Sequence, residues 1–79
     1  MVKKVLLYST AFCPWCQRTK EFFLANNIKY KDINVGSNIK AAQKMIKKSR
    51  QQGVPVIDIE GEIIVGYDES ALKKALKIK

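Results

Sequence analysis

The sequence has no histidine and only two cysteines among its 79 residues. A structural zinc site takes four ligands, mostly cysteine and histidine, so this chain supplies at most half of one unless two chains share the metal. Small secreted domains depend on several disulfides, whereas two cysteines in one motif favour a reducing compartment. The sequence therefore predicts no metal site and no disulfide framework.

Long apolar runs are also missing. The first run, Val5 to Tyr8, has four residues, which is too few for the apolar region of a signal peptide or for a membrane span. The length suits one small domain. We therefore expect a single domain over residues 1–79, in a monomeric cytoplasmic protein with no membrane segment.

Acidic residues are few, and the net charge is +8. Between Asp32 and Asp58 every charged side chain is positive, and no aromatic residues interleave with these cations as a base-stacking surface would require. The pattern favours a solvated helix face, or a basic flank that attracts an anionic thiol or acidic partner, over a nucleic-acid surface. The cations are Lys40, Lys44, Lys47, Lys48 and Arg50.

The sequence does contain a Cys-Pro-Trp-Cys motif, residues 13–16, between an apolar run and a segment of helical spacing. Proline favours the first position of a helix, which makes Cys13 the N-cap and puts Cys16 one turn further along. The N–H groups and dipole of the first turn stabilise a thiolate at Cys13. A thiolate attacks disulfides, and a second thiol nearby resolves the mixed disulfide. The motif therefore predicts Cys13 as the nucleophile and Cys16 as the buried resolving cysteine.

The remaining pattern predicts an α/β fold in which strands and helices alternate. Strands are expected at 3–8, 29–33, 56–59 and 62–65, and helices after Cys13, Asn38 and Asp68, with a two-residue turn at Glu60-Gly61. The first helix should bury Phe12, Cys16, Thr19 and Phe23 on one side. The second should bury a stripe opposite its lysines, consisting of Ile39, Ala42, Met45, Ile46 and Ser49.

Three stretches resemble segments of the glutaredoxins, small members of the thioredoxin superfamily, in the same order. Residues 8–16 resemble the active-site segment, residues 53–56 (Gly-Val-Pro-Val) the Val-Pro turn, and residues 66–69 (Gly-Tyr-Asp-Glu) the turn that contacts glutathione. The resemblance implies the minimal thioredoxin fold, β-α-β-α-β-β-α, whose four-stranded mixed sheet has helices on both faces. It also implies a cis bond between Val54 and Pro55.

The function implied by this resemblance is a dithiol–disulfide oxidoreductase that reduces protein disulfides or glutathione mixed disulfides. It would hold no cofactor and use glutathione as co-substrate. Trp15 is implied to be exposed beside the reacting sulfur, while Asp68 and Glu69 also suit the cap and first turn of the last helix. The implied substrate or glutathione contacts are Thr10, Trp15, Gln51, Val54, Pro55, Gly66, Tyr67, Asp68 and Glu69.

Two positions differ from many glutathione-using members. Thr10 stands where these have a lysine, and Val65 where they have the first of two glycines, so a β-branched side chain crowds the approach of glutathione. Other glutaredoxin-like redoxins take electrons from thioredoxin reductase, a flavoenzyme, and supply ribonucleotide reductase. That type of redoxin is the alternative function, and a non-catalytic basic binding module is a third.

Overall fold

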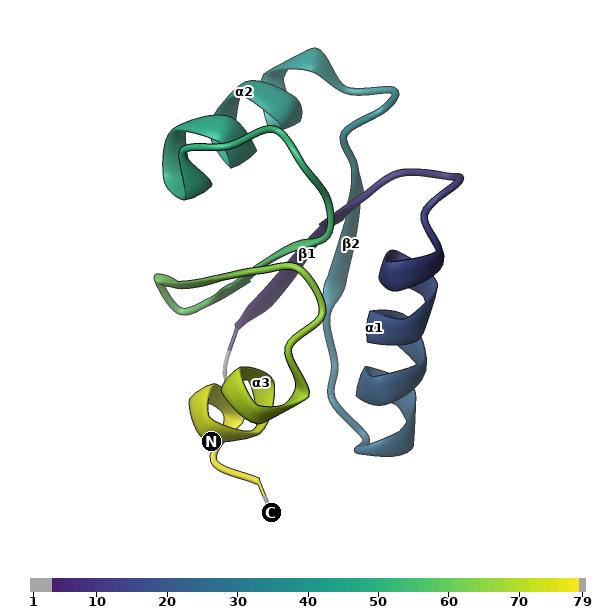
Figure 1. Cartoon of the computed structure of the whole chain (residues 1–79), viewed down its shortest axis with the longest axis vertical. Helices are drawn as coiled ribbons and strands as arrows, with labels where there is room; N and C mark the ends of the chain where they lie inside the picture. Colours follow the sequence, from purple (N-terminus) through teal and green to yellow (C-terminus); the bar gives the residue numbers. More distant parts are fainter. Residues whose placement is uncertain (1–3, 79) are drawn as a thin grey trace.

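The computed structural model describes residues 4–78, which form three helices and one four-stranded sheet (Figure 1). The elements are β1 (Val5–Ser9), α1 (Pro14–Ala25), β2 (Lys31–Asn34), α2 (Ile39–Ser49), β3 (Val56–Ile59), β4 (Glu62–Val65) and α3 (Glu69–Leu76). This confirms the predicted order. Strands β1 and β2 each begin two residues later than predicted. Lys3, the predicted first residue of β1, lies outside the described residues.

The sheet has the strand order β2-β1-β3-β4. β1 pairs with β2 in parallel, and the pairs β1–β3 and β3–β4 are antiparallel. The β3–β4 turn falls at Glu60 and Gly61, both with positive φ, as a two-residue hairpin turn of type I′ requires. The sheet is therefore mixed, and the predicted hairpin is confirmed.

Side chains of neighbouring strand residues point to opposite faces of the sheet, so β1 contributes to two cores. Leu7 packs with Phe23 of α1 and Leu72 of α3 in the larger cluster. Tyr8 packs with Met45 of α2 in a smaller one. Helices α1 and α3 therefore cover one face and α2 the other (Figure 1), which is the arrangement of the minimal thioredoxin fold.

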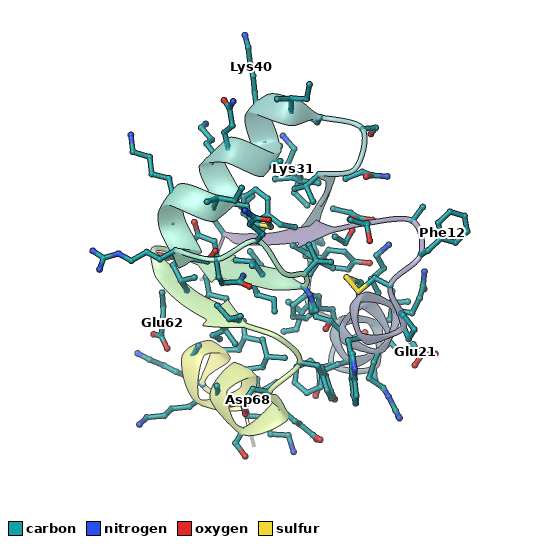
Figure 2. All side chains as sticks on the ribbon, turned by 45° about the horizontal axis from the view of Figure 1, so that its top comes forward. Phe12, Glu21, Lys31, Lys40, Glu62 and Asp68 are labelled. Atoms are coloured by element: carbon teal, nitrogen blue, oxygen red, sulfur yellow. A yellow bond between two sulfur atoms is a disulfide. The ribbon has the colours of Figure 1, made fainter. Side chains whose placement is uncertain are left out.

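Two predicted helical faces are wrong in part. Phe12 is 97% exposed and projects into solvent (Figure 2), because it precedes the N-cap, where helical spacing does not apply. Ile39, in the first turn of α2, is 77% exposed, and Ile46 is exposed as well. Met45 is the buried residue of this helix, so α2 meets the sheet through its middle and not along a full stripe.

Lys48 also departs from the predicted solvated face. Its ammonium donates to Asp58 Oδ2 at 2.7 Å and to the Tyr8 hydroxyl at 2.9 Å, and so joins α2 to β3 and β1. Bonding to Asp58, and then to Tyr8, raises the pKa of Lys48. Burial raises the pKa of Asp58, but the bonds from Lys48 and from the Gly61 N–H outweigh burial and lower it. Both groups are therefore charged at neutral pH.

No helix among the described residues is long and apolar enough to cross a membrane.

Candidate active site

Cys13 occupies the N-cap of α1, as predicted. Its backbone is extended, with φ −137° and ψ 102°, and Pro14 is the first residue of the helix. The Cys13 sulfur accepts the Cys16 backbone N–H at 3.1 Å. This sulfur therefore lies at the end of the helix where unpaired N–H groups and the dipole stabilise negative charge.

The two cysteines form a disulfide at the start of α1, drawn as the yellow bond in Figure 2, with their Cα atoms 5.1 Å apart. Cys16 is fully buried, whereas Cys13 is 9% exposed. Of the two cysteines, Cys13 is therefore the one that keeps some contact with solvent. Within residues 4–78 there is no cluster of three or more cysteine or acidic side chains that could hold a metal.

The three stretches singled out in the sequence meet at the beginning of α1. The Val54–Pro55 bond is cis, as the resemblance implies, and the Pro55 carbonyl accepts the Gly66 N–H at 2.8 Å. Tyr67 stacks on Trp15, with ring centroids 6.1 Å apart and planes 17° from parallel. The turn after β4 is therefore held both to the loop before β3 and to the cysteine helix.

The side chain of Trp15 is 58% exposed, as expected for an aromatic residue between the two cysteines. Val65 is half-exposed at the end of β4, and Gly66 has a φ of 78°, in the left-handed region that favours glycine. Thr10 lies in the turn after β1, close to Gly36. A Cβ atom placed on Gly36 would lie 3.8 Å from the methyl carbon of Thr10. This arrangement puts Val65 next to the turn predicted to contact glutathione.

Gln51 shapes the loop that leads to Val54. Its side-chain amide donates to the Gly53 carbonyl at 2.9 Å, and its side-chain oxygen accepts the Gly53 N–H at 2.7 Å. In this structure the side-chain amide is thus bonded within its own loop, so Gln51 stabilises the loop that precedes β3.

Asp68 and Glu69 act on α3. Asp68 is the N-cap, and its Oδ1 accepts the Ala71 N–H at 3.1 Å, which confirms the predicted cap. Glu69 pairs with Lys73 one turn further on, at 3.2 Å. Both carboxylates are exposed, so these roles leave them in contact with solvent.

Sequence reasoning missed a polar network that anchors the cysteine helix to the sheet. Asp32 of β2 accepts the Ser9 hydroxyl at 2.6 Å and pairs with Lys20 of α1 at 2.8 Å. Burial raises the pKa of Asp32, but the bonds from Lys20 and Ser9 outweigh it and lower the pKa. The sequence feature that could have indicated this network is Ser9, a polar residue at the end of an otherwise apolar strand.

An N-cap cysteine in a disulfide, next to a Val-Pro loop on this fold, defines a redox-active thiol protein of the thioredoxin superfamily. The family model described as Glutaredoxin matches residues 5–64. The chain belongs to the glutaredoxin family.

Several known proteins are similar to this chain. An uncharacterized glutaredoxin-like 8.6 kDa protein in the rubredoxin operon of Clostridium pasteurianum is 42% identical over 73 residues, covering 92% of this chain and 97% of that protein. The crystal structure of a mutant of the thioredoxin-like protein BC3987 has a TM-score of 0.91 and 28% identity, covering 96% and 97% of the two chains. That of glutaredoxin Grx-1 from Archaeoglobus fulgidus has a TM-score of 0.87 and 28% identity, covering 95% and 87%.

The two thiols of the reduced protein should differ in reactivity. At pH 6 we expect iodoacetamide to alkylate Cys13 at least about tenfold faster than Cys16, because the N-cap favours its thiolate and Cys16 is buried. Mass spectrometry of timed samples measures both rates. In denaturant the difference should disappear, and equal rates in the folded protein would refute the N-cap argument.

Proposed function

We propose that this protein is a dithiol–disulfide oxidoreductase that reduces protein disulfides and glutathione mixed disulfides in the cytoplasm, with no bound cofactor. The observation that carries the proposal is the asymmetric pair of cysteines, with Cys13 at a helix N-cap, where it keeps some exposure, and Cys16 fully buried. The family to which the chain belongs supports thiol–disulfide chemistry.

The reaction has two exchanges. The Cys13 thiolate attacks one sulfur of the substrate disulfide, breaking that bond and releasing the other sulfur as a thiolate. The Cys16 thiolate then attacks the Cys13 sulfur, which forms the Cys13–Cys16 disulfide and releases the second substrate thiolate. Two electrons pass to the substrate, and the released thiolates take up two protons from solvent.

Substrate binding is assigned to the three stretches around Cys13. Val54 lies two residues before the start of β3, where its backbone is placed to form a short antiparallel contact with an extended substrate. Trp15 packs against the substrate near the reacting sulfur. Thr10, Pro55, Gly66 and Tyr67 complete the proposed binding surface, with Gln51 supporting it. Asp68 and Glu69, both exposed, are placed to bind the ammonium group of the γ-glutamyl end of glutathione.

Glutathione is the proposed reductant, although its site departs from the family pattern. Val65 narrows the approach to the Gly66 turn, and Thr10 offers no charge to a glutathione carboxylate. The alternative reductant is a thioredoxin-reductase-like flavoenzyme, in a redoxin that supplies ribonucleotide reductase. The exposed apolar side chains of Phe12, Trp15 and Val65 favour this alternative, because apolar surface next to a site suits contact with another protein.

Combining Val65→Gly with Thr10→Lys should strengthen the use of glutathione. We expect the half-saturating glutathione concentration to fall about tenfold, the gain from one charge-assisted hydrogen bond and a less crowded turn. Reduction of hydroxyethyl disulfide, coupled to glutathione reductase, measures this concentration. Gln43→Lys, which adds the same charge on the exposed side of α2, is the matched control and should leave it unchanged.

A parallel assay with thioredoxin reductase in place of glutathione separates the two reductants. Weak saturation by glutathione in the wild type that improves in the double variant supports the proposal. Tight saturation unaffected by the substitutions would show that these positions do not control thiol choice. Turnover with thioredoxin reductase alone would establish the alternative.

A further inference from the structure

A cleft of about 770 Å³ separates α2 from strands β1 and β2 on the sheet face that α2 covers. Its floor includes the apolar side chains of Leu6 and Ile33, and five lysines line it: Lys4, Lys31, Lys40, Lys44 and Lys48. Figure 2 labels Lys40 on α2 and Lys31 on the strand side. None of the residues assigned to the active site lines this cleft.

The lysines converge for reasons of local geometry. Lys40, Lys44 and Lys48 are spaced by four residues, so they follow one side of α2. On the strand side of the cleft, Lys4 lies two residues before Leu6, and Lys31 lies two residues before Ile33. Residues two apart on a strand share a face, so both lysines lie on the face of the sheet that α2 covers. A helix stripe and a strand wall of the same charge therefore face each other across the cleft.

Only part of this positive charge is compensated. Asp32 is the acidic residue in the lining, and its two oxygens are already bonded to Ser9 and Lys20. Lys48 is paired with Asp58. Among residues 4–78, no ion pair joins any of the other four cleft lysines to a carboxylate. Like charges that line one cleft repel one another, and an anionic ligand would relieve that repulsion.

We propose that the cleft binds an acidic segment of a partner protein. The unpaired lysines come from two successive turns of α2 (Lys40 and Lys44) and from the strand side, and charges on two walls match a chain with repeated carboxylates better than a single compact anion. Lysine presents a point charge and not the planar fork with which arginine grips phosphates. The ring of Tyr8 at the floor is buried, so nucleic-acid bases have no surface on which to stack.

The probe for this proposal is a fluorescein-labelled peptide of ten glutamates, titrated at low salt and followed by anisotropy. Lys40→Gln with Lys44→Gln should weaken its binding about tenfold. The matched control, Lys47→Gln with Lys74→Gln, removes the same charge outside the cleft and should weaken binding less than about twofold. Nitrogen–proton correlation spectra of each variant verify the fold.

The same spectra of the wild-type protein locate the peptide independently of any variant. Shifts concentrated at Leu6, Ile33 and Ala41 support the proposal. Equal weakening by both variant pairs would show diffuse attraction to the net charge, and shifts confined to Trp15 and Tyr67 would move the peptide to the redox site. Tighter binding of a ten-nucleotide thymidine strand to the cleft would assign it to nucleic acid. Each of these three results overturns the proposal.

Discussion

Replacing Cys13 with serine should abolish disulfide reduction and lower turnover roughly a thousandfold or more. The N-cap can stabilise a thiolate but cannot make a serine hydroxyl ionise near neutral pH, so the first exchange loses its nucleophile. Insulin reduction and hydroxyethyl disulfide reduction both measure the loss. If Cys13→Ser loses none of the activity of the wild-type protein, the protein is the non-catalytic binding module and not an oxidoreductase.

Cys16→Ser is the paired variant, with a different expected result. Turnover of glutathione mixed disulfides should persist, because a second glutathione can release the first from Cys13. Reduction of protein disulfides should fail, because the tethered mixed disulfide has no internal thiol to resolve it. If Cys16→Ser reduces insulin at the wild-type rate, the assigned division of labour between the cysteines is wrong.

Lys48→Met should destabilise the fold by about 2–3 kcal/mol at pH 7. The substitution leaves Asp58, with 11% of its side chain exposed, charged and without its principal partner, and breaking a buried pair costs about 3–5 kcal/mol. We expect a loss below that range because the Lys48 side chain is 32% exposed, so the ion pair is only partly buried. Urea denaturation measures it, and Lys47→Met on the exposed side of α2 should change stability by less than about 0.5 kcal/mol.

The same pair predicts how stability depends on pH. The pKa of Asp58 is lower in the folded state than in the unfolded state. Its contribution to folding stability is therefore fully present above the unfolded-state pKa of about 4, and is lost as the pH falls through the folded-state pKa. The pKa of Lys48 is raised, so its contribution is lost only at strongly alkaline pH. Lys48→Met should therefore flatten the acid dependence, leaving the part due to Asp32. An unchanged acid profile would contradict the role given to this pair.

Features determined by short stretches of sequence could be predicted. Asn38 and Asp68 cap their helices through N–H groups three residues away, and Glu60-Gly61 forms the hairpin turn. Cys13 is placed by the proline that follows it. Each of these depends on contacts within a few residues, where local backbone geometry decides the outcome.

Features that depend on how elements pack could not be predicted. Lys48 and Tyr8 are forty residues apart in sequence, and Ser9 and Asp32 are twenty-three apart. Ile39 has the spacing of a buried residue, yet it is exposed because α2 reaches the sheet at Met45. Helical periodicity identifies one side of a helix but not how much of that side is covered.

The unequal cores on the two faces of the sheet imply that the molecule does not open as one unit. Helix α2 is attached through one buried methionine and the bonds of Lys48, whereas α1 and α3 share the larger apolar cluster. Free energies of local opening follow the apolar contact that is lost, so α2 has the lower cost of separating from the sheet. Amide protons of α2 should therefore exchange with solvent before those of α1. Because α2 forms one side of the cleft, it can move away from the sheet to admit a large ligand while the cysteines at the start of α1 keep their geometry.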